Sequence, residues 1–244
     1  MKRLVLSAVV AALLSMLLTA TPASGYMLGA VATSHVGAFG GHSLIHQPYT
    51  TYNSSEGRVY NIGLNFPNGD FMQIGYVDLA DWWSECNHTG LAVFVTVLLA
   101  GGGHVGSLYN ISNCNLTGTH WFTVVRTATS PNVIWRAKMD GVFIGPSFYT
   151  GSYNGWVWTD AVDAFSEYVK SPPTPGATMA TTEYEKGLEL LLTDGLWHVP
   201  GHAYYFDLDV SCPPDFIHLI ASNRFQTKQG TGGTECRSTL TTLW

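Results

Sequence analysis

The chain has 244 residues, a formal net charge of −6 and no cluster of Lys or Arg. Binding to a nucleic-acid backbone needs a positively charged surface, so this composition argues against a nucleic-acid partner. Only 11% of the residues are charged and 13% are aromatic, which indicates a large, well-buried core.

Residues 1–24 have the pattern of a secretory signal peptide. Lys2 and Arg3 form a charged start, and an apolar run from Leu4 to Leu18 leads to small residues around the expected cleavage site. This run is shorter than the roughly 20 apolar residues that a membrane-spanning helix needs. We therefore expect a secreted, extracellular protein with no stable membrane anchor in the mature chain, in which residues 25–244 form one domain.

The cysteines are even in number in a chain that is expected to enter an oxidising compartment, which predicts two disulfides. The four residues are Cys86, Cys114, Cys212 and Cys236. Three pairings are open, and the pairings 86–114 and 212–236 are favoured because each closes a local loop. Four N-glycosylation sequons are typical of surface loops in an exported glycoprotein. They begin at Asn53, Asn87, Asn110 and Asn115.

The first clear hairpin lies at residues 59–78. Residues 30–52, before it, are rich in Gly, His, Ser and Thr and predict an irregular segment with one strand at residues 43–46. From Val59 to Phe66, apolar residues alternate with small or polar ones, the period-2 pattern of a strand with one buried face. Asn68-Gly69 then supplies the positive φ angles of a primed hairpin turn, and residues 71–78 form the second strand.

Further strands follow at short intervals, and Asp140-Gly141 predicts another tight hairpin turn. The expected strands cover residues 91–99, 106–111, 120–126, 133–139, 142–144, 163–169, 197–210 and 216–222. A Pro-rich loop at 171–176 interrupts them without ending the domain, and Thr182 with Glu185 has the capping-box spacing of one short helix. We therefore predict an all-β fold, an antiparallel β-sandwich of the jelly-roll or concanavalin-like kind, with at most one or two short helices.

The segment from residue 147 to 159 is rich in aromatic residues set among Gly, Ser, Thr and Asn. Flat aromatic faces can stack on sugar rings while neighbouring polar groups form hydrogen bonds. The candidate ligand-binding residues are Tyr149, Tyr153, Trp156 and Trp158. The alternative interpretation is that these side chains fill the core of the sandwich.

Gln73 and Glu167 are the candidate catalytic residues. Each lies in phase with apolar neighbours on its expected strand, so each can point into a cleft or into the sheet interior. A carboxyl group desolvated there has a raised pKa and can act as general base and then acid, while a nearby amide donates to a developing oxyanion. The alternative is a buried Glu that hydrogen-bonds to backbone groups.

Metal binding has weaker support. Two histidine pairs have i,i+4 spacing, but one lies in an expected strand and a Pro-Gly step interrupts the other, whereas zinc binding at this spacing needs a helix. The pairs are His42 with His46 and His198 with His202. Asp207, Asp209 and Asp215 offer oxygen ligands for calcium or form a solvated acidic strip. We predict no metal and no cofactor.

Three segments carry a resemblance to known proteins: Gln73 to Asp78, Trp135 to Gly141, and Ala164 to Glu167. Over residues 59–176 the chain resembles exported concanavalin-like β-sandwich proteins, mostly of unknown function, and more distantly the glutamic peptidases of the eqolisin type. The resemblance implies the same sandwich. It also implies a catalytic pair of a Gln after a strand start and a Glu on a later strand, positions at which this chain has Gln73 and Glu167.

Two functions are therefore expected. The first is a secreted, lectin-like protein that binds carbohydrate or a cell-surface polymer through its aromatic loops. The alternative is an acid-acting glutamic endopeptidase that acts on peptide substrates with Gln73 and Glu167. The substitution Glu167→Gln separates them, because it should abolish hydrolysis and leave sugar binding intact.

Overall fold

The computed structural model describes residues 27–46, 57–79, 91–109, 118–129, 132–149, 156–169, 182–208, 215–229 and 241–242. These residues form sixteen strands and contain no helix. The strands are β1 (Met27–Ala38), β2 (Gly40–His46), β3 (Gly57–Asn65), β4 (Phe71–Leu79), β5 (Ala92–Leu98), β6 (His104–Tyr109), β7 (Thr119–Ala128), β8 (Ile134–Met139), β9 (Val142–Tyr149), β10 (Thr159–Val169), β11 (Thr182–Leu191), β12 (Trp197–His198), β13 (Tyr204–Leu208), β14 (Asp215–Ala221), β15 (Arg224–Gln229) and β16 (Thr241–Thr242).

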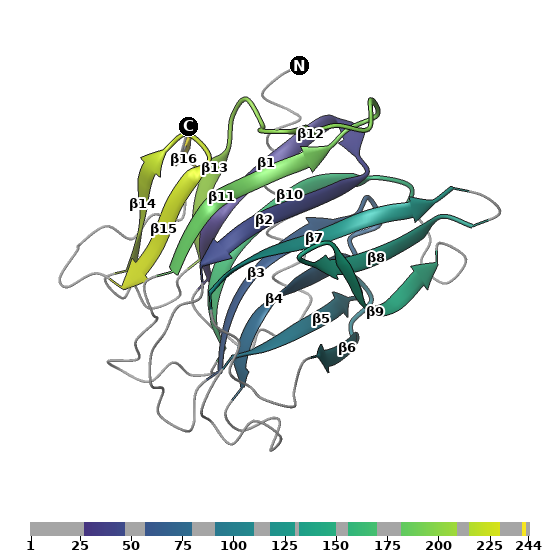
Figure 1. Cartoon of the computed structure of the whole chain (residues 1–244), viewed down its shortest axis with the longest axis horizontal. Helices are drawn as coiled ribbons and strands as arrows, with labels where there is room; N and C mark the ends of the chain where they lie inside the picture. Colours follow the sequence, from purple (N-terminus) through teal and green to yellow (C-terminus); the bar gives the residue numbers. More distant parts are fainter. Residues whose placement is uncertain are drawn as a thin grey trace.

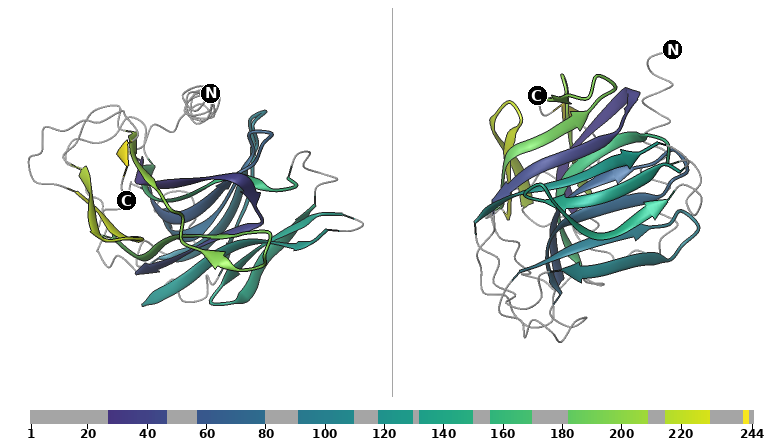
Figure 2. Two further views of the ribbon diagram at one scale, coloured as in Figure 1. Left: turned by 90° about the horizontal axis from the view of Figure 1, so that it is seen from above. Right: turned by 45° about the vertical axis from the view of Figure 1, so that its right-hand side comes forward.

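Two antiparallel sheets form a sandwich (Figures 1 and 2). The first sheet has the strand order β16-β13-β1-β10-β3-β4-β5-β6, and the second has the order β14-β15-β11-β2-β7-β8-β9, with β12 paired to β11. In Figure 1, β11, β2, β7 and β8 lie in front of β10, β3, β4 and β5. The all-β sandwich predicted from the sequence is confirmed.

The main core lies between the sheets and follows the alternation of the strands. Tyr60, Ile62 and Leu64 of β3 are fully buried, as are Met72 and Ile74 of β4, and all five belong to one apolar cluster with residues of the second sheet. Side chains alternate between the two faces of a strand, so the residues between these five lie on the opposite face of the first sheet. We call that face the outer face of the first sheet.

The two predicted hairpin turns have different geometries. In the turn between β3 and β4 only Gly69 has a positive φ (87°), and the Phe66 N–H donates to the Asp70 carbonyl oxygen at 2.9 Å. The primed turn predicted from Asn68-Gly69 is therefore wrong, since that turn needs positive φ at both residues. Between β8 and β9, Asp140 and Gly141 do both have positive φ (50° and 80°), which confirms the tight hairpin there.

Two predictions of secondary structure are wrong. The short helix expected from Thr182 is strand β11, in which Tyr184, Leu188 and Leu190 are buried and which pairs with β2 and β15. Residues 30–52, expected to be largely irregular, include most of β1, which lies between β10 and β13, and all of β2. The small residues of β1 reflect close packing rather than a loop. A Cβ placed on Gly29 would lie 2.4 Å from the Cβ of Phe165.

Several predictions fall outside the described residues. They are the signal peptide at 1–24, the Pro-rich loop at 171–176, the four cysteines with their pairing, and the four sequons. Within the described ranges, no helix has the length and apolar character needed to cross a membrane.

Candidate functional site

The register of the first sheet separates the two residues predicted to be catalytic. Gln73 on β4 pairs with Gly63 on β3, and Gly63 pairs with Asp163 on β10. Glu167 pairs with Val59, four residues further along β10. Four residues of a strand span about 13 Å. The backbone therefore places Asp163, and not Glu167, level with Gln73; the side chain of Glu167 is not among those described.

Strand β3 lies between the strands that carry Gln73 and Asp163, and its side chains form hydrogen bonds with both residues. On its outer face it carries Asn61, Gly63 and Asn65 in succession. The Asn61 Nδ2 donates to Gln73 Oε1 at 2.8 Å, and the Asn65 Nδ2 donates to Asp163 Oδ2 at 2.7 Å. Each Asn thus orients one member of the pair. Because Gln73 accepts through Oε1, its Nε2 group remains to donate.

The polar group is almost entirely shielded from solvent. Asp163 is 4% exposed and Gln73 is 7% exposed. Burial raises the pKa of the Asp163 carboxyl to about 7, against the opposing effect of the hydrogen bond from Asn65. Asp163 Oδ1 and Asn61 Oδ1 are buried and have no hydrogen-bond partner among the described residues. A carboxyl group that changes protonation near neutral pH is suited to take up and release a proton during catalysis.

An aromatic ring covers this group. A Cβ placed on Gly63 would lie 2.0 Å from Phe71 Cζ and 2.4 Å from Phe71 Cε2, so the ring of Phe71 rests on Gly63. The centroid of this ring is 6.1 Å from that of Phe165 on β10. Any side chain at position 63 would collide with the ring, which is why a glycine stands between Gln73 and Asp163.

Asp163 was missed because its partner is two strands away. It lies in phase with Phe165 on the same predicted strand as Glu167, so periodicity alone did not distinguish the two carboxyl groups. The available signal was on β3. There Asn61 and Asn65 flank Gly63 on the face opposite the apolar side chains. Three successive Asn or Gly residues on one face are unusual in a strand that is buried on both faces.

The aromatic segment is divided between core and surface. Trp156 is fully buried, stacked on Phe66 at 4.1 Å, and its Nε1 donates to Asp70 Oδ2 at 2.8 Å. Its predicted place on a ligand-binding surface is therefore wrong, because the indole links the β3–β4 turn to the core. Trp158 is 43% exposed. Tyr149 ends β9 with an undescribed side chain, and Tyr153 lies outside the described residues.

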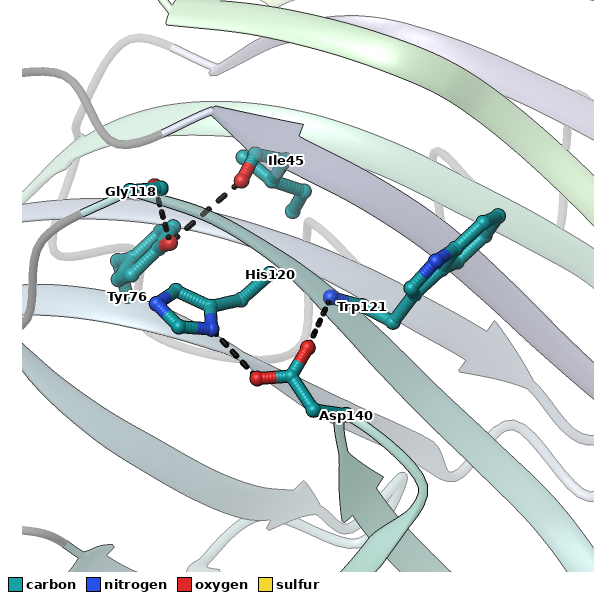
Figure 3. A network of polar contacts seen from close by, with 6 residues as sticks. All are labelled: Ile45, Tyr76, Gly118, His120, Trp121 and Asp140. Carbon is teal, nitrogen blue, oxygen red and sulfur yellow. Dashed lines mark hydrogen bonds and ion pairs between the residues drawn. The ribbon is translucent and has the colours of Figure 1, made fainter.

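A second polar network lies at the opposite end of β4 (Figure 3). Asp140 accepts hydrogen bonds from His120 Nδ1 at 2.5 Å and from the Trp121 backbone N–H at 2.9 Å. The Tyr76 hydroxyl donates to the Gly118 carbonyl oxygen at 3.2 Å. Burial, and then the charge of Asp140, raises the pKa of Tyr76, so this hydroxyl stays protonated and acts as a donor. The Tyr76–Gly118 bond joins β4 of the first sheet to the residue before β7 of the second, and the bonds of Asp140 join the β8–β9 turn to β7 within the second sheet.

The histidines considered for zinc contact other side chains. His42 Nε2 lies 2.5 Å from Glu189 Oε2, and its ring stacks on Trp197 with centroids 3.8 Å apart. Burial lowers the pKa of His42, although Glu189 opposes the effect. His198 Nε2 lies 2.8 Å from Asp194 Oδ2. Within the part of the chain that the structure describes, no three His, Cys, Asp or Glu side chains are grouped as a metal site would require.

Comparisons with known proteins agree on the fold. No protein-family model matches the sequence, and no curated protein matches it. Two solved structures of scytalido-glutamic peptidase, one with a peptide-based transition-state analogue and one with a transition-state-analogue inhibitor, each superpose with a TM-score of 0.55, at 10% and 9% identity. In both cases the match covers 84% of this chain and 98% of the peptidase.

A third similar structure is SCP-B, a member of the eqolisin family of peptidases, in complex with the tripeptide Ala-Ile-His. It has a TM-score of 0.47 and 11% identity over 84% of this chain and 98% of that one. The chain thus has the two-sheet β-sandwich fold of scytalido-glutamic peptidase, at a sequence identity that shows the fold alone.

Proposed function

We propose that the protein is a secreted hydrolase that cleaves peptide bonds, with Asp163 as general base and acid and Gln73 as the donor to the oxyanion. The observation that carries this proposal is the register that sets these residues on either side of Gly63, each oriented by an Asn of β3. The shared fold with a peptidase captured with a peptide-based transition-state analogue supports the choice of substrate class.

The reaction begins with water activation. The Asp163 carboxylate takes a proton from a water molecule while the water oxygen bonds to the carbonyl carbon of the peptide. The carbonyl π electrons move to its oxygen, and the resulting oxyanion accepts a hydrogen bond from Gln73 Nε2. Asp163 then donates its proton to the amide nitrogen, the C–N bond breaks, and a carboxylic acid and an amine leave.

This pair changes the expected pH dependence. The Glu167 hypothesis called for an acid-acting enzyme, but Asp163 with a pKa of about 7 is protonated in acid and cannot accept a proton from water there. We therefore propose activity that rises with pH through about 7.

The test is peptide cleavage by the purified, exported chain. We expect a mixture of unstructured peptides incubated in H₂¹⁸O to yield new C-termini that carry ¹⁸O, read by mass spectrometry. The value of kcat/KM should rise tenfold per pH unit below the pKa and level off above about pH 7. Absence of ¹⁸O-labelled termini at every pH from 3 to 9 would refute the proposal.

A second candidate function is carbohydrate binding at the corner between β1 and β2. Trp158 rests on Gly37, where an added Cβ would meet its Cγ at 2.8 Å, and Trp197 lies over Gly40, 3.3 Å from the corresponding Cβ position. The two indoles are 43% and 37% exposed. We propose that these two rings offer apolar faces to a polysaccharide or another extracellular polymer.

Removal of both rings tests this candidate. We expect the double variant Trp158→Ala, Trp197→Ala to lose about tenfold in affinity for an insoluble polysaccharide that retains the unmodified protein, since two ring contacts of about 0.7 kcal/mol each disappear. Val142→Ala, at a 66% exposed position on β9, is the control and should leave retention unchanged. Equal retention of the double variant and the control would exclude this surface.

A further inference from the structure

The ring of Phe71 occupies the space directly above the proposed catalytic pair. Phe71 precedes Gln73 by two residues on β4, and therefore shares its face of the sheet. Its ring lies on Gly63, the residue that separates Gln73 from Asp163 in the register. A peptide whose carbonyl carbon is to reach both groups must pass over Gly63, and it cannot do so while the ring remains there.

The surroundings of the ring are apolar. Phe71 and Tyr204 pack against a buried cluster of Val31, Ala161 and Phe165. Val31 and Asp163 are paired across β1 and β10, so this cluster adjoins the carboxyl group directly. Phe71 itself is only partly buried, whereas Asp163 and Gln73 beneath it are nearly inaccessible. The ring is thus the outermost part of an apolar site beside the catalytic carboxyl.

We propose that Phe71 occupies the subsite for a large apolar side chain next to the scissile bond, and that substrate binding displaces its ring. This inference rests on the proposed peptidase function and assigns its substrate class: peptides with an aromatic or long aliphatic residue at the cleavage site. Displacing the ring exposes the apolar cluster to water, and only a substrate side chain of similar apolar area restores the burial. A small or polar substrate residue in the subsite does not restore this burial, so the free-energy cost of displacing the ring remains.

The experiment measures binding of a non-cleavable probe, a short peptide with phenylalanine beside a reduced peptide bond. The variant Phe71→Ala has no ring to displace, so we expect it to bind the probe about tenfold more tightly than the unmodified protein. Replacing phenylalanine by alanine in the probe should weaken binding to both proteins by tenfold or more. Equal affinity of the variant and the unmodified protein, or no preference for phenylalanine over alanine, would overturn the subsite.

Two further variants keep the test decisive. Val142→Ala removes an exposed apolar side chain on β9 of the second sheet, away from Phe71, and should leave probe binding unchanged. If Phe71→Ala does not fold, Phe71→Leu keeps an apolar side chain and should show a smaller gain in affinity. If Phe71→Leu binds the probe no more tightly than the unmodified protein, that result would count against the proposal.

Failure of this inference and failure of the proposed function give different results. If probe binding follows the expected pattern while the unmodified protein cleaves no peptide, the subsite stands and the hydrolase proposal falls. If the protein cleaves peptides without preference for large apolar residues and Phe71→Ala binds the probe no more tightly, the hydrolase stands and the subsite is overturned.

Discussion

Replacing Asp163 with Asn is expected to lower the rate of peptide hydrolysis by about 10²- to 10⁴-fold. Asn has almost the same shape and still accepts the hydrogen bond from Asn65, but it cannot take a proton from water or return one to the leaving amine. The loss should fall on kcat, with KM nearly unchanged, because the proton transfers belong to the transition state. Steady-state kinetics at pH 8, where Asp163 is ionised, measures the effect.

Glu167→Gln is the matched control for this variant. Glu167 lies on the same strand, four residues further along, and its register position is not level with Gln73. We expect it to retain activity within about twofold, since its carboxyl takes no part in the proposed reaction. The reverse result, an inactive Glu167→Gln and an active Asp163→Asn, would restore the pair expected from the resemblance to glutamic peptidases.

The stability of the protein is expected to fall between pH 4 and pH 7 because of the same carboxyl group. Its pKa is raised from 3.8 to about 7 on folding, so in this range the folded state holds a proton that the unfolded state has released. Folding is then penalised progressively as the pH rises, and the full cost above pH 7 is about 4 kcal/mol. Below pH 3.8 both states are protonated and the penalty is absent.

Urea unfolding at pH 5 and pH 8 measures this effect by difference. The free energy of unfolding of Asp163→Asn should exceed that of the unmodified protein at both pH values. This excess should be about 3 kcal/mol larger at pH 8 than at pH 5. Burial also raises the pKa of Asp160, an exposed carboxyl on the same strand, so Asp160→Asn should change the difference in the same direction but by much less than Asp163→Asn does. If the free energy of unfolding changes equally with pH in Asp163→Asn and in the unmodified protein, Asp163 is not held neutral by burial.

The sequence predicted the sandwich well because alternation and turn residues are local signals. Val59 to Phe66, and the turn at Asp140-Gly141, needed no knowledge of their partners. Strand β11 was mistaken for a helix because Thr182 and Glu185 imitate a helix start, and pairing with β2 and β15 overrode that local preference.

The site was only half predictable, for a related reason. Gln73 could be selected from its own strand, as a polar side chain in line with Phe71 and Val77. Its counterpart on β10 depends on which residue of that strand stands level with it, and two backbone pairings through Gly63 decide this. Trp156 was misplaced because a buried indole with a hydrogen-bonded Nε1 has the same local sequence context as an exposed one.

The position of β1 in the first sheet has a consequence for the order in which the chain assembles. β1 begins at Met27, yet its two neighbours are β10 and β13, whose paired residues lie more than a hundred positions later in the sequence. Contacts of such long sequence separation form late, so the first sheet is expected to fold slowly. Both edges of β1 lack their native partners until β10 has been made, and one edge lacks its partner until β13 has been made. Unpaired strand edges are sites where a nascent chain associates with others.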